Sequence, residues 1–591
     1  MKIQPLMALV VLSLPTLPGA RAAVRGFKAR NLGLLTLFRG AYGGPALLRP
    51  QARLASKGRL AEIRGGFPMD ARGTLRIVPW FSGVWIFLIG CSGPLPSPAS
   101  DWPHYRGPTH NGISTDRIST NWTGAATNPL WRVTQTNSLS SLAVSDGKAF
   151  TQMRRALDHA DREWCVALSA TNGTELWATS LDDADYPNGG VGFDDGPRST
   201  PAVADGRVFV LTSYLKLYCL NAISGAILWQ KDLAALYGSV APDWQNAASP
   251  IVDNGLVYLN GSTSTLALMA FRASDGALAW RAHDEGITTY STPTLATIHG
   301  IRQVIFATLQ GLISINPANG DLFWRADYPP FEHPKMLAMS PVVWEDIIFI
   351  TGARVYGLGS VAYQASFSND VWSVERLWWN NITASHWATP VCHNGFLYGP
   401  FGIFVFDGLG ARLTCVDIRS GTVRWQAPNF GRGATLLVGN ELVCVTERGD
   451  LVLVKANPTA YTELGRFQAI PNFHPDTNKC WNMPAIADGK VYVRSTSMVA
   501  AYDLSDPLLK LDPPRFAGPA AMQLTIGTAN GSPINSNRLP GIELLTTTNT
   551  ADNLAQWTKL TNALTLTNGR ARVDNIDAAH PRRYFMTREA K

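Results

Sequence analysis

Seven short polar segments of the chain hold most of the residues that could recognise a ligand. Each segment leads into an apolar run, and together they carry carboxylates, guanidinium groups, an imidazole, amides and aromatic rings. The candidate residues are Asp194, Asp195, Arg198, Trp244, Asn246, Tyr290, His386, Trp387, Arg432, Trp481 and Asn482. Aromatic rings beside cations suit a flat anionic ligand, a sugar or a peptide. We call this set the mouth residues and predict that they surround one binding site.

Other reactive residues are better explained by structure than by chemistry. The run Asp158-His159-Ala160-Asp161 lies in a polar turn, and Cys392-His393 has no acidic residue near it in the sequence. The chain contains no His-Glu-x-x-His metal motif, no phosphate-binding P-loop and no Gly-x-Ser-x-Gly nucleophile motif. We therefore predict no catalytic residue and no metal ligand from motifs.

The elements that must position the mouth residues repeat along the chain. In LNAISGAILW (220–229), Gly225 stands four residues before Trp229, and this spacing returns at 173–177, 276–280, 320–324 and 421–425. A glycine supplies the positive φ that a tight hairpin needs. The tryptophan offers a large flat surface that can pack on the neighbouring repeat. The pattern predicts a hairpin that ends in an outer strand.

A second pattern opens each repeat, with a proline, a short apolar run and a tight turn, as in PAVADGRVFV (201–210). The prolines at 201, 250, 293, 341 and 390 lie 43 to 49 residues apart. Asp-Gly between apolar alternations is a strong hairpin signal, so each repeat is expected to form four antiparallel strands. Eight repeats predict an all-β fold, an eight-bladed β-propeller of four-stranded blades over 128–506.

Large aromatic residues are predicted to dock each blade on the next. These residues are Trp131, Trp177, Trp229, Trp280, Trp324, Trp378, Trp425 and Phe467. The last repeat lacks its own outer strand, whereas Trp131 lies in a strand with no blade before it. We therefore expect the strand of Trp131 to complete the last blade and close the ring.

The first 91 residues are typical of an export leader. Residues 1–76 hold 13 Lys/Arg and two acidic residues, so the rest of the chain has a net charge of −4 and offers no surface for nucleic acid. Residues 1–68 are interpreted as a leader or an over-extended start, and 69–91 as a signal peptide ending in Leu-Ile-Gly-Cys. That end is similar to the bacterial lipobox, which predicts lipidation of Cys91. One long leader with an incidental Cys91 is the alternative.

The remaining segments complete the predicted domain organisation. Residues 92–127 are an N-terminal lead-in, 507–517 a proline-rich linker, and 518–591 a small C-terminal β domain, interpreted as a sandwich with an Asn-Gly hairpin at 568–569. Six cysteines follow Cys91 without any Cys-x-x-Cys pair. Buried thiols are the preferred interpretation, although disulfides stay possible in an oxidising compartment.

The repeat unit Pro-x-Val-x-Asp-Gly-x-Val-Tyr/Phe-Val, followed by Ala-x-Ser/Thr-Gly-x-x-x-Trp, resembles the pyrroloquinoline-quinone (PQQ) repeat. The resemblance covers roughly 128–506. It implies one of two classes, namely PQQ-dependent alcohol or glucose dehydrogenases, or non-catalytic outer-membrane assembly lipoproteins. The stretch DWPHYRGPTHNGIS (101–114) is also similar to the lead-in of PQQ-repeat proteins from planctomycete- and verrucomicrobium-like bacteria.

The resemblance leaves the function open between these classes. A dehydrogenase would hold PQQ with Ca²⁺ on carboxylates and amides, with an aspartate as general base. The methanol type stacks PQQ under a disulfide between adjacent cysteines, which this chain lacks. The seven segments contain no glutamate, and Asp194 and Asp195 are their only obvious calcium carboxylates.

The sequence therefore favours an exported, lipid-anchored, monomeric binding or scaffold protein of the periplasm, outer membrane or cell surface. Its expected partners are envelope proteins or glycans, without a cofactor. A PQQ- and calcium-dependent alcohol or sugar dehydrogenase is the alternative, and a carbohydrate-binding surface protein is a third possibility, suggested by the mouth tryptophans.

Overall fold

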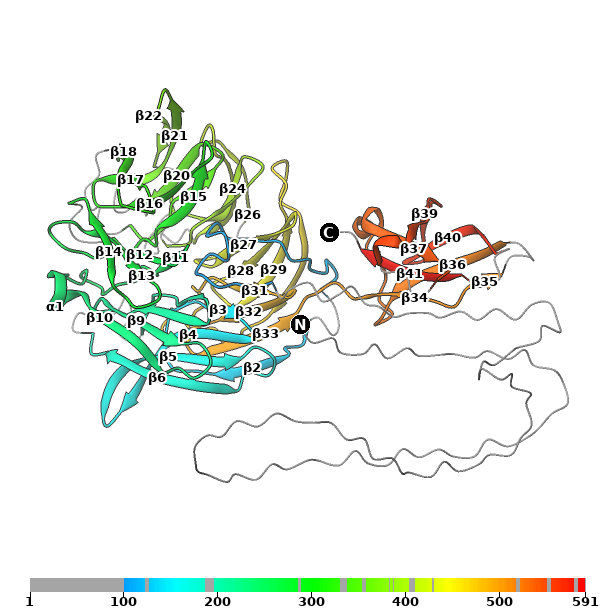
Figure 1. Ribbon diagram of the computed structural model, residues 1–591, viewed down its shortest axis with the longest axis horizontal. Helices are drawn as coiled ribbons and strands as arrows, with labels where there is room; N and C mark the ends of the chain where they lie inside the picture. The colour runs from blue at the N-terminus through cyan, green and yellow to red at the C-terminus, as the bar shows by residue number, and fades with distance from the viewer. Residues whose placement is uncertain are drawn as a thin grey trace, which may run out of the picture.

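The structure is a computed structural model whose ring of β-sheets is shown in Figure 1. It describes residues 100–122, 127–186, 196–284, 289–329, 337–352, 358–381, 383–385, 387–402, 410–427, 430–516, 521–549, 554–578 and 583–589. Cys91, Asp194, Asp195 and His386 lie outside these residues, and so do the predicted leader and signal peptide.

Eight antiparallel sheets follow one another along the described part of residues 131–503. The first four are β3 (Ala143–Ser145), β4 (Lys148–Leu157), β5 (Ala160–Ser169) and β6 (Glu175–Asp183); β7 (Ala202–Ala204), β8 (Arg207–Leu211), β9 (Lys216–Asn221) and β10 (Ile227–Asp232); β11 (Ile251–Asp253), β12 (Leu256–Asn260), β13 (Leu268–Arg272) and β14 (Leu278–Ala282); and β15 (Thr294–Ile298), β16 (Ile301–Ala307), β17 (Gly311–Ile315) and β18 (Leu322–Asp327). One short helix, α1 (Leu233–Tyr237), follows β10.

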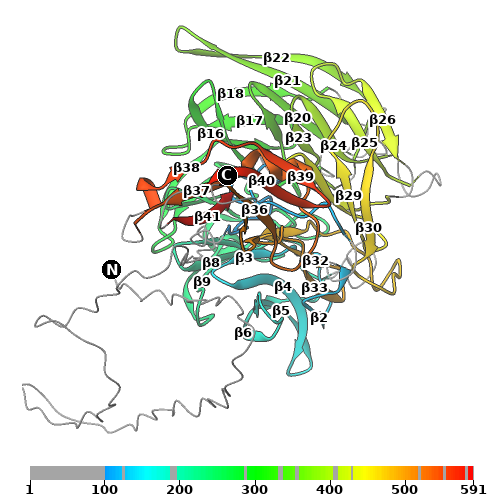
Figure 2. The ribbon, with the colours of Figure 1, turned by 90° about the vertical axis from the view of Figure 1, so that its right-hand side faces the viewer.

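The other four sheets have the same up-and-down order. They are β19 (Val342–Trp344), β20 (Ile347–Gly352), β21 (Gly359–Ser368) and β22 (Val371–Asn380); β23 (Val391–His393), β24 (Phe396–Phe401), β25 (Arg412–Asp417) and β26 (Val423–Ala427); β27 (Ala434–Val438), β28 (Glu441–Val445), β29 (Asp450–Lys455) and β30 (Glu463–Gln468); and β31 (Ala485–Ala487), β32 (Lys490–Arg494) and β33 (Met498–Asp503) with β2 (Trp131–Thr134). The long hairpin β21–β22 projects beyond the other sheets (Figure 2). The predicted propeller of four-stranded antiparallel sheets is confirmed.

The two ends of the propeller segment meet in one sheet. Strand β2 pairs antiparallel with β33, and Trp131 faces Ala501 in the register. Strand β3 of the first sheet in turn lies beside β31 of the last. The ring is thereby closed by hydrogen bonds between residues far apart in the sequence, and neither end leaves an open sheet edge there.

The glycine of each Gly-x-x-x-Trp unit packs on the tryptophan of the preceding sheet. A Cβ on Gly225 would lie 2.6 Å from the Trp177 ring, and one on Gly276 would lie 2.6 Å from Trp229. The Trp177 indole N–H also donates across the junction, to the carbonyl of Ala222 at 3.3 Å. Glycine therefore has two roles, because it adopts the positive φ of the hairpin and leaves space for the indole.

Two sheets without the glycine show how the docking adapts. The sheet after Trp324 has the long β21–β22 hairpin, and the Trp324 N–H turns to Gln303 Oε1 in its own sheet at 2.9 Å. Phe467 packs on Trp122, with ring centroids 5.6 Å apart, and on Tyr502. The remaining docking indoles donate to the next sheet, through Trp131, Trp229, Trp280, Trp378 and Trp425.

Hydroxyl groups just ahead of the first strand of several sheets connect neighbouring sheets. The Ser141 amide donates to Thr200 Oγ1 (3.1 Å), the Thr200 amide to Ser249 Oγ (2.9 Å) and the Ser249 amide to Thr292 Oγ1 (2.9 Å). The Met483 amide donates to Ser141 Oγ at 2.9 Å, so the last sheet is joined to the first. These residues fix the loops that carry the mouth residues.

The predicted lead-in contains a segment, residues 100–114, that we call the strap. It lies against the first strands of several sheets, in dark blue in Figure 1. Trp102 forms a bridge with Val144, and the Val203 amide donates to the Pro103 carbonyl at 2.8 Å. Its end, β1 (Ile113–Ser114), pairs in parallel with β27 as a fifth strand of that sheet.

Buried polar groups hold the strap. The Arg106 guanidinium donates to the carbonyls of Thr389 (3.1 Å) and Pro390 (2.9 Å), and it is 2% exposed. Burial lowers its pKa to about 10. His104 and His110 are also buried, with ring centroids 4.5 Å apart.

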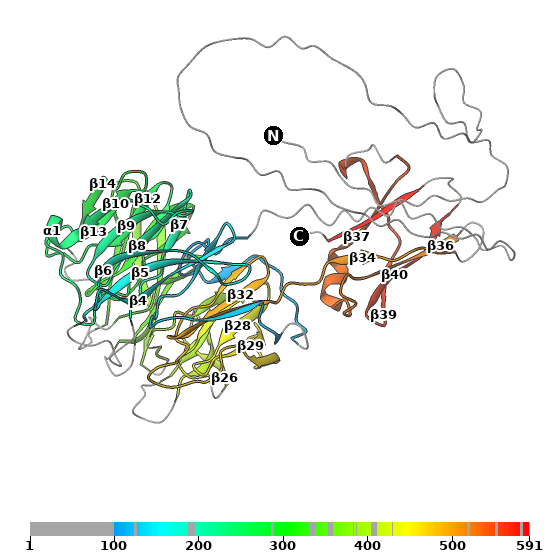
Figure 3. The ribbon, with the colours of Figure 1, turned by 90° about the horizontal axis from the view of Figure 1, so that it is seen from below.

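The C-terminal residues form two facing sheets around their own core, drawn as a separate body in Figure 3. One contains β34 (Leu509–Leu511), β35 (Arg515–Phe516), β36 (Ala521–Thr528), β39 (Leu564–Thr567) and β40 (Arg570–Asp577); the other contains β37 (Ile542–Thr547), β38 (Thr558–Lys559) and β41 (Tyr584–Glu589). The prediction of 507–517 as a linker is wrong, because both β34 and β35 pair with β36. Pro513 and Pro514 lack an amide donor, which is tolerated between short edge strands.

The six cysteines after Cys91 are buried free thiols. Burial raises the pKa of Cys219, Cys415, Cys444 and Cys480 to about 12. These thiols are therefore unreactive packing residues. Among the described residues, no helix is both long and apolar enough to cross a membrane.

Candidate functional site

Three of the mouth residues form an aromatic and cationic cluster. Trp387 precedes β23, Arg432 precedes β27 and Trp481 precedes β31, so three successive sheet junctions contribute one residue each. The two indole centroids lie 4.3 Å apart, and the Arg432 guanidinium carbon lies 5.2 Å from Trp387 and 4.9 Å from Trp481. All three side chains are half-buried. We call these three residues, with the two described next, the Arg432 cluster.

Two residues outside the predicted set complete this cluster. Glu447 Oε1 accepts the Trp481 indole N–H at 2.8 Å and lies 3.6 Å from Arg432 Nε, while Oε2 accepts the Arg432 amide at 3.4 Å. The Lys479 ammonium lies 4.2 Å from the Trp481 ring centroid, and Lys479 is 1% exposed. Burial lowers the pKa of the Arg432 guanidinium, and the Glu447 carboxylate opposes that shift.

Sequence reasoning missed Glu447 because it examined only the loops that enter each sheet. Glu447 lies in the turn between β28 and β29, and such turns share an end of the sheet with the entering loops. The available signal was the polar turn Thr-Glu-Arg-Gly-Asp after an apolar strand. Lys479 lies in the loop that enters the last sheet, two residues before Trp481, and belongs to the same polar segment as Trp481 and Asn482.

Three other mouth residues form a second group. Arg198 Nη1 donates to the Trp244 carbonyl at 2.5 Å, and the Trp244 amide donates to the Tyr290 hydroxyl at 3.1 Å. The Trp244 and Tyr290 rings stack at 6.1 Å with an interplanar angle of 26°. Tyr290 is 8% exposed, so this group stiffens the mouth more than it offers a surface.

The two mouth asparagines hold loops in place. Asn246 is buried and bridges its own loop, donating to the Ala248 carbonyl at 3.0 Å and accepting the Ala248 amide at 3.0 Å. Asn482 donates to the Ser140 carbonyl at 3.0 Å. Asn482 Oδ1 and the buried Gln152 Oε1 have no hydrogen-bond partner among the described residues. A bound water is the simplest group to satisfy such acceptors.

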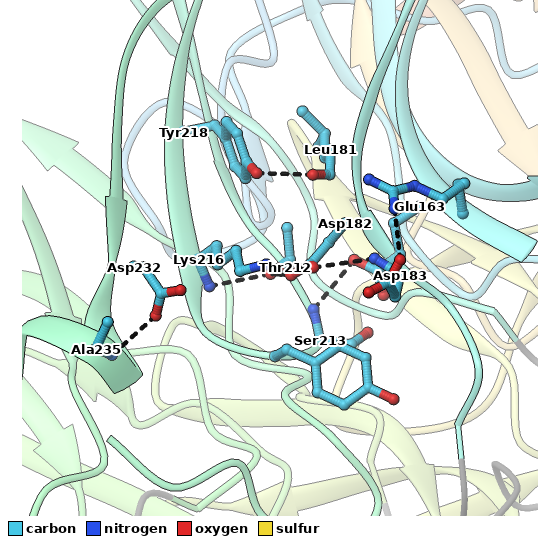
Figure 4. A network of polar contacts seen from close by, with 12 residues as sticks. Glu163, Leu181, Asp182, Asp183, Thr212, Ser213, Lys216, Tyr218, Asp232 and Ala235 are labelled. Carbon is cyan, nitrogen blue, oxygen red and sulfur yellow. Dashed lines mark hydrogen bonds and ion pairs between the residues drawn. The ribbon is translucent and has the colours of Figure 1, made fainter. Parts of the chain in front are cut away.

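A buried carboxyl lies between the first two sheets (Figure 4). Glu163 is 0% exposed; its Oε1 accepts the Tyr186 hydroxyl at 2.7 Å and its Oε2 accepts the Ser213 amide at 3.1 Å. Desolvation raises its pKa to about 7. Neighbouring Asp182 is satisfied by Thr212 and by Lys216, whose ammonium lies 2.8 Å away.

The described residues do not fit a calcium-bound quinone. Calcium needs several oxygen ligands, usually with more than one carboxylate. Glu447 already accepts from Trp481 and Arg432 through both oxygens, and Glu163 is fully buried with both oxygens accepting hydrogen bonds. Within the described ranges, no three His, Cys, Asp or Glu side chains are grouped to hold a metal ion. Asp194 and Asp195 lie outside those ranges, so their part in any such site stays a prediction.

The mouth residues thus fall into distinct sets. Arg432 lies with Trp387 and Trp481, Arg198 lies with Trp244 and Tyr290, and the two asparagines support loops. Asp194, Asp195 and His386 are outside the described residues. The Arg432 cluster is therefore the best candidate for a binding site.

Comparison with known proteins gives relatives of more than one kind. Residues 161–427 match a family described as "Outer membrane protein assembly factor BamB". The chain is 25% identical over 298 residues to the outer membrane protein assembly factor BamB of Moranella endobia (strain PCIT), covering 49% of this chain and 58% of that protein. It is 22% identical over 302 residues to tetrathionate hydrolase of Acidithiobacillus ferrooxidans, covering 48% and 54%.

A solved structure with a similar chain course is that of quinohemoprotein alcohol dehydrogenase from Comamonas testosteroni. It has a TM-score of 0.49 and 14% identity, and covers 71% of this chain and 82% of that one. The chain spans little more than half the length of the curated relatives it matches. These curated relatives include both an assembly factor and an enzyme. The family match and the ring of four-stranded sheets confirm the resemblance carried by the repeat: this chain is built on a PQQ-like propeller.

Proposed function

We propose that this protein is an exported, monomeric binding or scaffold protein of the cell envelope, attached to a membrane through lipid on Cys91. It works without a cofactor and without catalysis, and it binds an envelope protein or glycan at its mouth. The similarity to an outer membrane assembly factor supports an envelope role. The net charge of −4 outside residues 1–76 supports a partner other than nucleic acid.

The state of Glu447 is the observation that carries the non-catalytic proposal. A general base or calcium ligand needs a free carboxylate oxygen facing the reacting group. Glu447 is instead engaged by the Trp481 indole, the Arg432 amide and the Arg432 guanidinium. It therefore serves to orient Trp481 and Arg432, which is the arrangement of a binding surface.

Reconstitution with PQQ and Ca²⁺ tests this proposal against a PQQ-dependent dehydrogenase of alcohols or sugars. The purified protein is titrated with PQQ and Ca²⁺ by calorimetry and then assayed for dye-linked oxidation of alcohols and sugars. We expect neither saturable heat nor turnover. Saturable binding with turnover, lost in Asp194→Ala or Asp195→Ala, would replace the scaffold proposal with the dehydrogenase.

The proposed anchor is tested separately. Cells that express the protein are grown with labelled palmitate, and their membranes are fractionated. We expect label and membrane association in the wild type and loss of both in Cys91→Ser. Cys480→Ser serves as the matched control, because Cys480 is a buried thiol of the propeller. Label that persists in Cys91→Ser would remove the anchor from the proposal.

A further inference from the structure

We infer that the Arg432 cluster binds a carboxylated sugar, with the Arg432 guanidinium paired to the carboxylate and the sugar ring against Trp387 and Trp481. This inference rests on the proposed binding function of the mouth and names the ligand class of that site. It concerns an acidic residue of a glycan, such as a hexuronate, and it involves no covalent step.

The guanidinium of Arg432 is held by Glu447 and by the two indoles. Its Nε faces Glu447 Oε1 at 3.6 Å, and both indoles lie within 5.2 Å of its central carbon. Among the described residues, neither terminal nitrogen of Arg432 makes a hydrogen bond, and the side chain is 22% exposed. A planar fork with two free amino groups matches a carboxylate through two parallel hydrogen bonds.

The charges of the cluster favour an anion. The Arg432 guanidinium and the Lys479 ammonium both lie against the Trp481 ring, beside the Glu447 carboxylate. Burial already lowers the pKa of Arg432, so the guanidinium is partly deprived of water. A carboxylate that hydrogen-bonds the terminal nitrogens would offset the solvation free energy that the guanidinium loses on burial. A neutral ligand would offset less of it.

The indoles favour a sugar over an acidic peptide. Trp387 and Trp481 are half-buried and rigid, because they pack on each other at 4.3 Å and Glu447 fixes the Trp481 N–H. Rigid aromatic rings offer a flat apolar surface on which a sugar ring can pack at low entropic cost, and a few polar groups then orient the ligand. A hexuronate carries its carboxylate directly on the ring, so one residue reaches both the indoles and the adjacent fork.

The chain contains a matched control for this arrangement. Arg419 lies over the Trp344 ring at 4.7 Å and pairs with Glu345 at 3.1 Å, which repeats the arginine, indole and glutamate set. Arg419 is 55% exposed, and Trp344 has no stacked indole partner among the described residues. Glu345 and Arg419 lie in the hairpin turns β19–β20 and β25–β26, at the other end of their sheets from the entering loops. The control therefore has the same chemistry without the second indole.

The test is a titration of the purified full chain with an oligogalacturonate, in which tryptophan fluorescence and calorimetry measure the binding. We expect saturable binding that is weakened roughly tenfold or more in Arg432→Lys, which keeps the charge and loses the fork. Arg419→Lys should bind like the wild type. A neutral oligogalactoside of the same length should bind at least roughly tenfold more weakly than the oligogalacturonate.

The remaining outcomes separate this inference from the proposed function. Equal binding of neutral and acidic sugars, or full affinity in Arg432→Lys, would overturn the inference. A folded Trp481→Phe variant with unchanged affinity would also overturn it. Binding of a poly-glutamate peptide in place of the sugar, dependent on Arg432, would overturn the sugar and leave the binding function standing. Turnover with PQQ and Ca²⁺ would overturn the function itself.

Discussion

At the scale of single residues, Glu163 shows how burial without a counter-charge changes a carboxyl. Its two oxygens accept hydrogen bonds from Tyr186 and Ser213, and no ion pair reaches it among the described residues. Desolvation raises its pKa from 4.5 to about 7, and the hydrogen bonds oppose this only in part. The folded protein therefore holds a proton there that the unfolded chain releases above pH 4.5.

Replacement of this carboxyl should flatten the dependence of stability on pH. The folded-state pKa lies above the unfolded value, so its stabilising contribution is full below pH 4.5 and is lost as pH rises through about 7. The expected loss is about 3 kcal/mol of unfolding free energy. Denaturant unfolding of Glu163→Gln at pH 5 to 8 should show a shallower decline than the wild type. Asp183→Asn, which removes an exposed ion pair with Arg162, is the control and should keep the wild-type slope.

The residues of the mouth could be predicted only in part. The loops that enter each sheet follow from the repeat, so Trp387, Arg432 and Trp481 were expected together and do meet. Glu447 comes from a hairpin turn and Glu163 from within β5, and the importance of each depends on its burial and its partners in the folded chain. A periodic pattern indicates strand positions, whereas such partners are set by the packing of one sheet against the next.

At the scale of elements, the glycine of each Gly-x-x-x-Trp unit is needed both for the turn and for the close packing between neighbouring sheets. Gly225 and Gly206 belong to one sheet and have similar positive φ, 72° and 71°. A Cβ on Gly225 would lie 2.6 Å from Trp177, whereas one on Gly206 meets nothing within 4 Å. Gly206→Ala should cost about 1 kcal/mol from its backbone conformation. Gly225→Ala should cost at least about 2 kcal/mol more, because the indole must move.

Thermal and denaturant unfolding of the two variants separates these costs. The double variant Gly225→Ala with Trp177→Leu should lose less stability than the sum of the single variants, because both act at one junction. If Gly225→Ala and Gly206→Ala proved equally stable, the glycine would serve only the turn.

The strap is an element that the repeat pattern does not predict. Its partners are the first strands of sheets far along the chain, such as Val144, Val203 and Leu437, and its own residues have no period. The pKa values of its polar groups are shifted because the folded chain buries them. Desolvation lowers the pKa of His104 to about 4 and that of His110 well below its usual value, while His104 faces Asp253 and His110 faces Arg302 and Arg106.

Acid should therefore loosen the strap. The folded-state pKa of His104 lies below the unfolded value of 6.5, so its stability contribution is lost as pH falls from 6.5 through about 4. His104→Phe keeps a ring but has no titrating group. Between pH 7 and pH 4 its free energy of unfolding should fall by about 3 kcal/mol less than that of the wild type. Hydrogen exchange of the 100–114 peptide would measure this. His474→Gln, at an exposed site, is the control; equal acid sensitivity of all three proteins would contradict the prediction.

At the scale of the whole molecule, the ring follows from local signals repeated along the chain. Tight turns such as Asp205-Gly206 and the Gly-x-x-x-Trp hairpins lie within single repeats and recur along the chain. The propeller could therefore be predicted from the sequence. The C-terminal sandwich was recognisable from strand alternation, but its first edge strands were not. Their pairing with β36 outweighs the prolines that separate them, and edge pairing leaves little trace in a single sequence.

One charged network joins the propeller to the C-terminal sandwich. Glu589 lies 2.8 Å from Arg117 Nη1 and 2.8 Å from Arg538 Nη2, and Arg538 Nε lies 3.8 Å from Asp506. The Arg538 and Glu589 side chains are 8% and 16% exposed. Removal of one member of a nearly buried ion pair leaves an uncompensated charge, which typically costs about 3–5 kcal/mol. Arg538 and Glu589 both belong to the sandwich, so part of this cost acts within it. The link to the propeller side runs through Arg117, which is 45% exposed, and through Asp506.

Glu589→Gln removes the pair with Arg117 and should loosen the contact between the sandwich and the propeller. Small-angle scattering should show a larger radius of gyration, and limited proteolysis should cut between β33 and β34, at residues 504–508, faster than in the wild type. The unfolding midpoint of the propeller should not change. Asp512→Asn removes a surface pair with Arg570 within the sandwich and is the matched control, which should scatter like the wild type. An unchanged scattering profile for Glu589→Gln would mean that contacts other than this network hold the two parts together.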